Sequence, residues 1–255
     1  MVGNLLLRGM LVGIVAGILC FAFLKTFGEP QVDRAIAFET QMDEAKAQAD
    51  RAKGIVVPDE PELVSRPVQA GIGLFTGVAV YSAAFGGLFA LVFAFVYGRV
   101  GNLGPRATSA LLAAAGLLAI YVVPNLKYPA NPPSVGNPDT IGMRTALYFT
   151  MIAISLAAMV GAAMLRHRLL ARHGGWNASL IAGAAYLVAV IVVGLALPSI
   201  NEVPDQFPAV VLWQFRIASM GAQLILWTTI GLAFGALTER AAASRGSVRL
   251  RTAAF

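Results

Sequence analysis

The 255-residue sequence contains a single cysteine, Cys20, and only two histidines, His167 and His173. One cysteine excludes a disulfide within the chain and any cluster of thiolates, and we expect it to be a buried, unreactive thiol. Two histidines are too few for the His-rich site of a membrane metalloprotease or a haem pair. The sequence also lacks a glycine-rich loop that ends in Gly-Lys-Ser or Gly-Lys-Thr, so ATP hydrolysis would require another chain. These absences predict a protein that is not an enzyme.

Charged residues are also scarce, at 13% of the chain, whereas hydrophobic residues make up 58%. A helix needs roughly 20 apolar residues to cross the hydrocarbon core of a bilayer. Six apolar runs approach or exceed this length: 5–27, 70–97, 107–123, 146–165, 178–197 and 209–237. The third run is the shortest, so a five-span arrangement with that segment interfacial or re-entrant is the alternative. The sequence predicts an all-α polytopic integral membrane protein with six transmembrane helices.

Charges of opposite sign lie on opposite sides of these spans. Twelve of the thirteen carboxylates fall in segments on one side, while the segments on the other side carry ten arginines and only Glu239. Because Lys and Arg in short loops mark the cytoplasmic side, both termini are predicted inside, with residues 238–255 as a basic cytoplasmic tail. The basic residues are dispersed over four membrane-flanking stretches, so the net charge of +6 indicates topology rather than nucleic-acid binding.

Glycines recur at every fourth position in the first and last spans. They are Gly9, Gly13 and Gly17 in the first span, and Gly231 and Gly235 in the last. Glycines at this spacing let helix backbones approach closely, which compensates for the missing hydrophobic drive between helices in lipid. We therefore expect these glycines to have a structural role.

Residues 28–66 form the one sizeable segment outside the predicted membrane region. Pro30 suits a first helical turn and Gly54 suits a helix end, so we predict a short extracytoplasmic helix over about 31–53, followed by an acidic linker. Its charged face is interpreted as a solvated, ion-paired surface. The alternative interpretation is an acidic vestibule that concentrates cations before entry, through the field of a charged mouth.

Two proline-rich segments, 124–139 and 198–208, face the same compartment as this helix. Proline disrupts both helices and sheet ladders, so we expect ordered turns at the outer mouth. Asp139 or Thr140 is positioned to cap the fourth span.

One face of the last span carries polar and large side chains at offsets of three and four. They are Arg216, Ser219, Met220, Gln223 and Trp227. An intramembrane arginine is costly unless it is paired or reaches the interface, so we expect Arg216 to meet Glu202, Asp205 or Asp139. This face is either an interhelical hydrogen-bond seam or the lining of a pathway, in which Arg216 would set the electrostatics.

Three blocks of sequence outside the spans carry a family resemblance. The first has Gly28-Glu29-Pro30, Asp33, Ala35-Ile36-Ala37 and Glu39; the second has Leu126-Lys127-Tyr128-Pro129-Ala130-Asn131-Pro132-Pro133, Thr140-Ile141-Gly142 and Arg144-Thr145; the third has Asn201-Glu202-Val203-Pro204, Phe207-Pro208 and Leu212-Trp213-Gln214-Phe215-Arg216. Together they resemble the CbtA family of cobalt transporter subunits over nearly the whole chain. The resemblance implies cobalt import across the bacterial inner membrane in support of cobalamin synthesis. It also implies a small single-span partner, CbtB, that resembles a His-bearing metal-presenting subunit.

The supply of metal ligands in this chain fits passage of a metal better than its storage. Cobalt(II) favours nitrogen ligands, but both histidines are predicted in an inner loop beside three arginines that would repel a dication. Weak oxygen ligands are available on the outer side: Glu29, Asp33, Glu39, Asn131, Asp139, Asn201, Glu202 and Asp205. We therefore expect no tightly bound cofactor, with cobalt(II) as the transported ion and histidine ligands supplied by the partner. The competing hypothesis is a non-transporting accessory or scaffold protein that docks a partner through its proline-rich outer loops.

Overall fold

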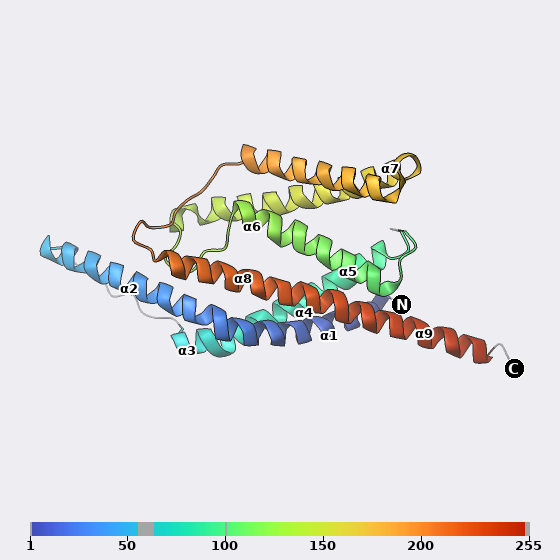
Figure 1. The fold of residues 1–255 in the computed structure, drawn as a ribbon. Coiled ribbons are helices and arrows are strands. Elements are labelled where there is room, and N and C mark those ends of the chain that lie inside the picture. The colour runs from blue at the N-terminus through green and yellow to red at the C-terminus, as the bar shows by residue number, and fades with distance from the viewer. Residues whose placement is uncertain (1, 56–63, 100, 253–255) are drawn as a thin grey trace. The chain divides into compact units, whose positions relative to one another are not determined.

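The computed structural model describes residues 2–55, 64–99 and 101–252 (Figure 1). These residues form helices, turns and loops, and no β-strand is present among them. They fall into two compact units. The first unit contains the chain up to Ala114, Pro132–Ser134 and the chain from Pro208 onward, and the second contains Ala115–Asn131 and Val135–Phe207. The prediction of an all-α fold is confirmed.

Five helices in the described part of the chain are long and apolar enough to cross a membrane. They are Val2–Ala52, Arg66–Val96, Pro105–Lys127, Pro138–Ala196 and Ala209–Ser244. Each of the six predicted runs falls within one of these helices to within a residue, and the 59-residue helix contains two of the runs. The helix that covers the shortest run has 23 residues, which exceeds the roughly 20 residues that a crossing needs. These lengths and compositions are those of a helical membrane protein.

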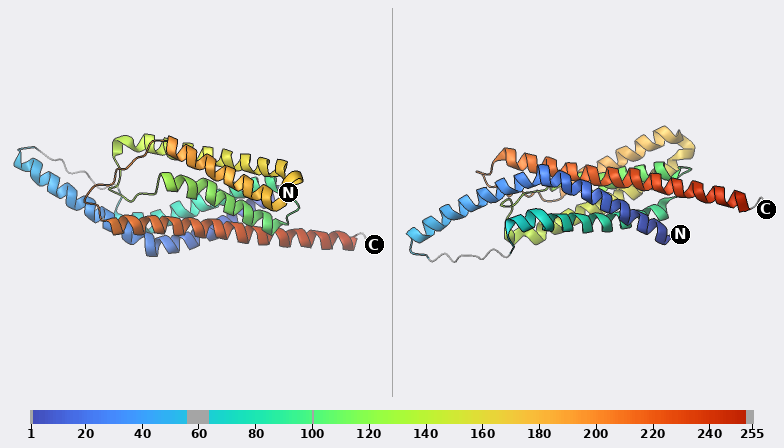
Figure 2. Two further views of the ribbon diagram at one scale, coloured as in Figure 1. Left: turned by 45° about the horizontal axis from the view of Figure 1, so that its top comes forward. Right: turned by 90° about the horizontal axis from the view of Figure 1, so that it is seen from below.

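The first membrane-length helix continues without a break beyond the first apolar run and ends at Ala52, as Figure 2 shows in blue. Its parts are α1 (Val2–Phe23), the π-helical turn η1 (Leu24–Gly28) and α2 (Glu29–Ala52). The prediction of a separate helix over 31–53 was therefore wrong about where the helix begins. Pro30 has no N–H to donate to the preceding turn, and a π-helical turn, in which the Glu29 N–H donates to the Leu24 carbonyl, absorbs that disruption. The predicted end is confirmed, because Gly54 follows the helix with φ +79°.

In the first unit, α1 packs along the second membrane-length helix. That helix comprises α3 (Arg66–Val68), the π-helical turn η2 (Gln69–Gly73) and α4 (Leu74–Val96). A Cβ added to Gly9 would lie 2.3 Å from the Gly86 carbonyl oxygen, and one added to Gly13 would lie 2.2 Å from that of Ser82. No side chain fits in these spaces, so the two backbones touch through their glycines. The predicted structural role of the first-span glycines is confirmed.

The glycines of the last membrane-length helix have a similar role. This helix comprises α8 (Ala209–Thr229), η5 (Ile230–Phe234) and α9 (Gly235–Thr252), and it lies against α5 (Pro105–Gly116). A Cβ on Gly231 would lie 2.6 Å from the Cβ of Ala113, and the Ser109 hydroxyl donates to the Gly231 carbonyl at 2.6 Å. Cys20 is 4% exposed, and its thiol donates to the Ala222 carbonyl at 3.3 Å. The cysteine is buried, as predicted.

The second unit is built around a helix that turns back on itself. Its elements are η3 (Leu117–Val122), α6 (Val123–Lys127), the 3₁₀ turn η4 (Pro138–Thr140) and α7 (Ile141–Ala196). Gly174, with φ 71° and ψ 169°, divides α7 into two arms, 141–173 and 175–196, which lie side by side (Figures 1 and 2). The Ser155 and Tyr186 hydroxyls hydrogen-bond across the arms at 2.8 Å, and the Arg166 Nε donates to the Ser179 hydroxyl at 2.9 Å.

The connection between the two arms is much tighter than the sequence suggested. We predicted a loop between the runs 146–165 and 178–197, but the backbone is helical on both sides of Gly174. A glycine can adopt this positive φ without strain, so one residue is enough to reverse the chain. His167 and His173 consequently lie on the end of the first arm rather than in a loop.

Candidate functional site at the proline-rich loops

The two proline-rich segments lie mostly in the second unit, where they are ordered and bonded to each other. The Tyr128 hydroxyl donates to the Pro198 carbonyl at 2.9 Å, and the Lys127 ammonium donates to the Ser199 hydroxyl at 2.9 Å. Within the first segment, the Asn125 side-chain oxygen accepts from the Ala130 N–H at 3.0 Å. The first two contacts hold the end of α6 and the residue after it against the residues that follow α7, so the two loops form one surface.

Glu202 is the centre of this surface. Its carboxylate accepts from the Asn137 backbone N–H at 2.6 Å and from the Thr140 hydroxyl at 2.7 Å, and the Arg144 Nε lies 3.4 Å away. The N–H of Asn137, the hydroxyl of Thr140 and the charge of Arg144 together hold the pKa of Glu202 below its usual value. Glu202 is therefore an ionised group that ties the proline-rich loop 198–208 to the turn before α7 and to the start of that helix.

Arg144 is fixed from two sides. Besides facing Glu202, its guanidinium donates to the Asn137 carbonyl at 3.2 Å. Gly136 lies directly beneath the guanidinium, with φ +126°, and a Cβ at that position would lie 2.2 Å from an Arg144 nitrogen. Glycine is thus required there both for the backbone conformation and for the approach of the arginine.

The capping of the turn before α7 differs from the prediction. We expected Asp139 or Thr140 to cap the helix, but Thr140 stands at the cap position without a side-chain bond to the helix, and its hydroxyl serves Glu202. The cap belongs to Asn137, whose side-chain oxygen accepts from the Asp139 N–H at 2.9 Å at the start of η4. The Thr140 hydroxyl does not cap the helix because it donates to Glu202 instead. Asn137 can close the turn because an Asn side chain readily accepts a hydrogen bond from the backbone N–H two residues further on.

In the first unit, the acidic start of α2 is bound to an arginine from the next helix. Arg66 pairs with both Glu29 and Asp33, with 2.8 Å separating its guanidinium from Asp33. Arg34, on the same turn, donates to the side-chain oxygen of Gln214 at 3.0 Å. These bonds connect α2 to the beginning of two other helices, α3 and α8. Two of the predicted weak metal ligands therefore have a cationic partner.

The side chains of the other predicted site residues differ in exposure. Glu39, Asp139, Asn201 and Asp205 are exposed, Asn131 and Pro129 are half-buried, and Pro132 is buried. Pro132 belongs to a short stretch of the first unit, in which the Ser134 hydroxyl donates to the Ala35 carbonyl at 3.0 Å. In the residues that the structure describes, no group of three or more His, Cys, Asp or Glu side chains gathers where a metal ion could bind.

The polar face of the last span lies within the first unit. Gln223 hydrogen-bonds to Tyr81 of α4, and the buried Trp227 meets Phe85 edge-on with ring centroids 4.9 Å apart. Arg216 is half-buried on α8. Its predicted carboxylate partners all belong to the second unit, so that pairing stays a prediction.

Sequence reasoning did not single out Asn137 or Arg66, although both organise a cluster. Asn137 had a signal, because Asn-Pro-Asp is typical of a turn that the Asn side chain closes. Arg66 also had one, since it follows a stretch rich in carboxylates and precedes a span. What the sequence could not give was the choice of partner, which depends on how the helices are placed.

The comparison with protein families supports the resemblance that the three blocks of sequence indicated. A family model described as "Probable cobalt transporter subunit (CbtA)" matches residues 2–239, which is nearly the whole chain. No curated protein and no solved structure matches the chain. The matched range contains both arginine–carboxylate clusters and all five membrane-length helices up to residue 239. The chain belongs to the CbtA family of probable cobalt transporter subunits.

Proposed function

We propose that this chain is the membrane subunit of a cobalt uptake system in the bacterial inner membrane, where it supports cobalamin synthesis. The observation that carries the proposal is the family match over residues 2–239. The distribution of carboxylates agrees with uptake, since twelve of thirteen lie on the side opposite the arginine-rich segments. A negative outer surface raises the local concentration of a divalent cation.

The proposed topology has six spans with both termini in the cytoplasm. It treats the two arms of α7 as the fourth and fifth spans, with the reversal at Gly174 on the cytoplasmic side. Arg166, Arg168 and Arg172 cluster at that reversal, as short cytoplasmic loops require. The outer ends then carry α2 and both proline-rich loops.

The proposed path gives cobalt(II) oxygen ligands on the outer side and no tight resting site in this chain. Glu29, Asp33 and Glu202 are neutralised by arginines, so exposed groups such as Glu39, Asp139 and Asp205 are the better first contacts. Oxygen ligands hold cobalt(II) weakly, which suits release. The nitrogen ligands that cobalt prefers would come from a small single-span, His-bearing CbtB-like partner.

A second candidate function is a non-transporting accessory or scaffold protein. The specific observation in its favour is that three candidate carboxylates, Glu202, Glu29 and Asp33, are bound within the protein, where Glu202 joins the two proline-rich loops and the other two join α2 to α3. A rigid surface of two bonded proline-rich loops suits the docking of a partner chain.

Cobalt accumulation in cells separates these two functions. Cells that lack other cobalt uptake systems would receive the partner with this chain, the partner alone, or this chain with an Asp139→Asn and Asp205→Asn double substitution. We expect this chain to raise cobalt content and the double variant to reduce the gain, while an Asp43→Asn variant on the exposed face of α2 serves as the matched control. Equal cobalt content with and without this chain would contradict transport and favour the scaffold. Parallel measurements with nickel and zinc define selectivity.

A further inference from the structure

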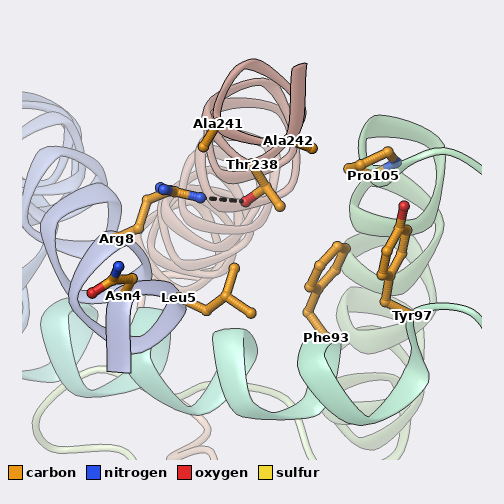
Figure 3. Close-up of a pocket in the computed structure, with 9 residues that line it drawn as sticks. All are labelled: Asn4, Leu5, Arg8, Phe93, Tyr97, Pro105, Thr238, Ala241 and Ala242. Carbon is orange, nitrogen blue, oxygen red and sulfur yellow. Dashed lines mark hydrogen bonds between the residues drawn. The ribbon is translucent and has the colours of Figure 1, made fainter. Parts of the chain in front are cut away.

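A pocket of about 140 Å³ opens at the end of the first unit where the described chain begins (Figure 3). It lies between α1, α4, α5 and α9. Leu5, Phe93 and Pro105 give its wall apolar surface, and Asn4, Arg8 and Thr238 give it polar groups. Figure 3 shows the guanidinium of Arg8 directed across the pocket mouth toward Thr238.

Arg8 brings a positive charge to this pocket that no carboxylate neutralises in the described part of the chain. Its hydrogen bond to the Thr238 hydroxyl is long, at 3.5 Å. The neighbouring carboxylate, Glu239, pairs instead with Arg106 on α5. A guanidinium has five N–H donors in a planar fork, so most of the donors of Arg8 are available to a ligand.

The position of the pocket narrows the chemistry of that ligand. The pocket lies where α4 ends, α5 begins and α1 enters the apolar region, and Arg99, Arg106 and Arg240 belong to the same end of these helices. A basic pocket between helix ends at the cytoplasmic membrane face attracts anionic lipid head groups, because that leaflet is negatively charged. A phosphate matches a guanidinium through two parallel charge-assisted hydrogen bonds.

We propose that this pocket binds the phosphate group of an anionic phospholipid in the cytoplasmic leaflet. Arg8 and Asn4 bind the phosphate oxygens, the hydroxyl of Thr238 holds the guanidinium in place, and the apolar wall covers the first carbons of the glycerol and acyl groups. A cavity of this size admits a group about as large as benzene, so the phosphate and the carbons next to it enter while the rest of the lipid stays in the bilayer. The leaflet assignment rests on the proposed topology, whereas the binding of the phosphate group does not.

Lipid affinity of the purified full-length chain in detergent tests this proposal. The probes are phosphatidylglycerol, phosphatidylcholine and inorganic phosphate, and the readout is binding measured by native mass spectrometry together with the rise in melting temperature. We expect phosphatidylglycerol to bind and stabilise the protein, and Arg8→Gln to weaken that binding about tenfold, as expected for loss of a charge-assisted hydrogen bond. Arg168→Gln, an exposed arginine of α7, is the matched control and should bind as the unchanged protein does.

A second variant keeps the proposal testable if Arg8→Gln does not fold. Ala241→Leu narrows the pocket and leaves Arg8 in place, so it should also weaken phosphatidylglycerol binding.

Equal phosphatidylglycerol affinity in the unchanged protein and either folded pocket variant would overturn the proposal. Equal stabilisation by phosphatidylcholine would also overturn it, because the site would not require a net negative lipid. Stabilisation by inorganic phosphate that matches phosphatidylglycerol would assign the pocket to a soluble anion and overturn the lipid assignment. Cobalt content does not enter any of these readouts, so this proposal and the uptake proposal fail separately.

Discussion

The carboxylate of Glu202 accepts hydrogen bonds from the Asn137 N–H and the Thr140 hydroxyl in the turn before α7, and it faces the guanidinium of Arg144 in the first turn of that helix. Each of these groups stabilises the charged carboxylate more than the neutral acid, which explains why its pKa lies below the usual 4.5. The folded state therefore binds a proton at Glu202 less readily than the unfolded state does. Ionised Glu202 consequently stabilises the folded state at pH values above its ordinary pKa of 4.5.

The pH dependence of stability follows from this shift. A carboxylate with a lowered pKa contributes its full stabilisation above its unfolded value of 4.5, and loses it as the pH falls through the lower folded value. We expect the melting temperature in detergent to fall below about pH 4.5, and Glu202→Gln to flatten part of that fall. Asp205→Asn, at an exposed carboxylate of the same loop, is the matched control for the loss of one negative charge. Identical profiles for Glu202→Gln and the unchanged protein would show that the carboxylate has no such role.

Arg144 offers a second test at this scale. Arg144→Lys keeps the charge near Glu202 but cannot also donate through a planar fork to the Asn137 carbonyl. We expect Arg144→Lys to lower the melting temperature less than Arg144→Gln does. In a double-mutant cycle, Arg144→Gln and Glu202→Gln should be partly redundant, because each removes the same pair. Strictly additive losses would indicate that the two side chains do not interact in solution.

Two of the long helices in this chain are altered or reversed by a single residue. Pro30 alters the first helix without ending it, since the turn η1 absorbs the missing donor. Gly174 reverses α7 completely with one residue at positive φ. At Pro30 only one backbone donor is lost, and the neighbouring residues keep helical φ and ψ by forming a π-helical turn. At Gly174 the φ angle itself is positive, so the backbone leaves the helical path and reverses.

Substitution at the reversal should expose this dependence. A Cβ on Gly174 would meet no atom within 4 Å, so the effect of Gly174→Ala comes from the backbone conformation alone. Such a strained residue costs about 1–3 kcal/mol. Gly175→Ala is the matched control, because Gly175 has equal space around it and no positive φ. We expect Gly174→Ala to lower the unfolding free energy in detergent and Gly175→Ala to change it little; equal effects would place the reversal elsewhere.

The crossing of α1 and α4 gives a test of packing. Gly13→Val would force a side chain into the Ser82 carbonyl, which lies 2.2 Å from the added Cβ, and the helices would have to separate. Overpacking of this kind costs typically about 1–3 kcal/mol. Gly77→Val on α4 is the control, since a Cβ there meets nothing within 4 Å. Cross-linking between cysteines on α1 and α4 should become slower only in the first variant, and unchanged cross-linking would contradict the close crossing.

At the scale of the whole molecule, the sequence was sufficient to predict which residues form the apolar helices. Runs of apolar residues and the glycine spacing depend on neighbours in sequence, which are visible without a structure. The Glu202 and Arg66 clusters depend on segments that are dozens of residues apart. The sequence therefore named Glu202 as a weak metal ligand and a possible partner of Arg216, and named Lys127 and Arg144 as motif residues, without giving the contacts of Glu202 with Arg144 or of Lys127 with Ser199. The sequence also failed to predict that the first helix is continuous, although the signal there is local. Proline is common both at the first turn of a helix and at a distortion within one, so Pro30 alone could not distinguish the two.

Cysteine labelling tests the six-span, inside-termini topology directly. With Cys20→Ala as the background, single cysteines would be placed at four exposed positions: Asn102, Asp139, Ala171 and Asp205. If Pro105–Lys127 and both arms of α7 cross the bilayer, an impermeant thiol reagent applied to whole cells should label positions 139 and 205, and label 102 and 171 only after permeabilisation.

Equal labelling at 102 and 139 would mean that the helix between them does not cross, and equal labelling at 139 and 171 would mean the same for the first arm of α7. Labelling of 102 and 171 from outside, with 139 and 205 protected, would reverse the orientation, because the arginine-rich ends would then face outward against the charge rule. The uptake direction and the assignment of the Arg8 pocket to the cytoplasmic leaflet would have to be reversed with it.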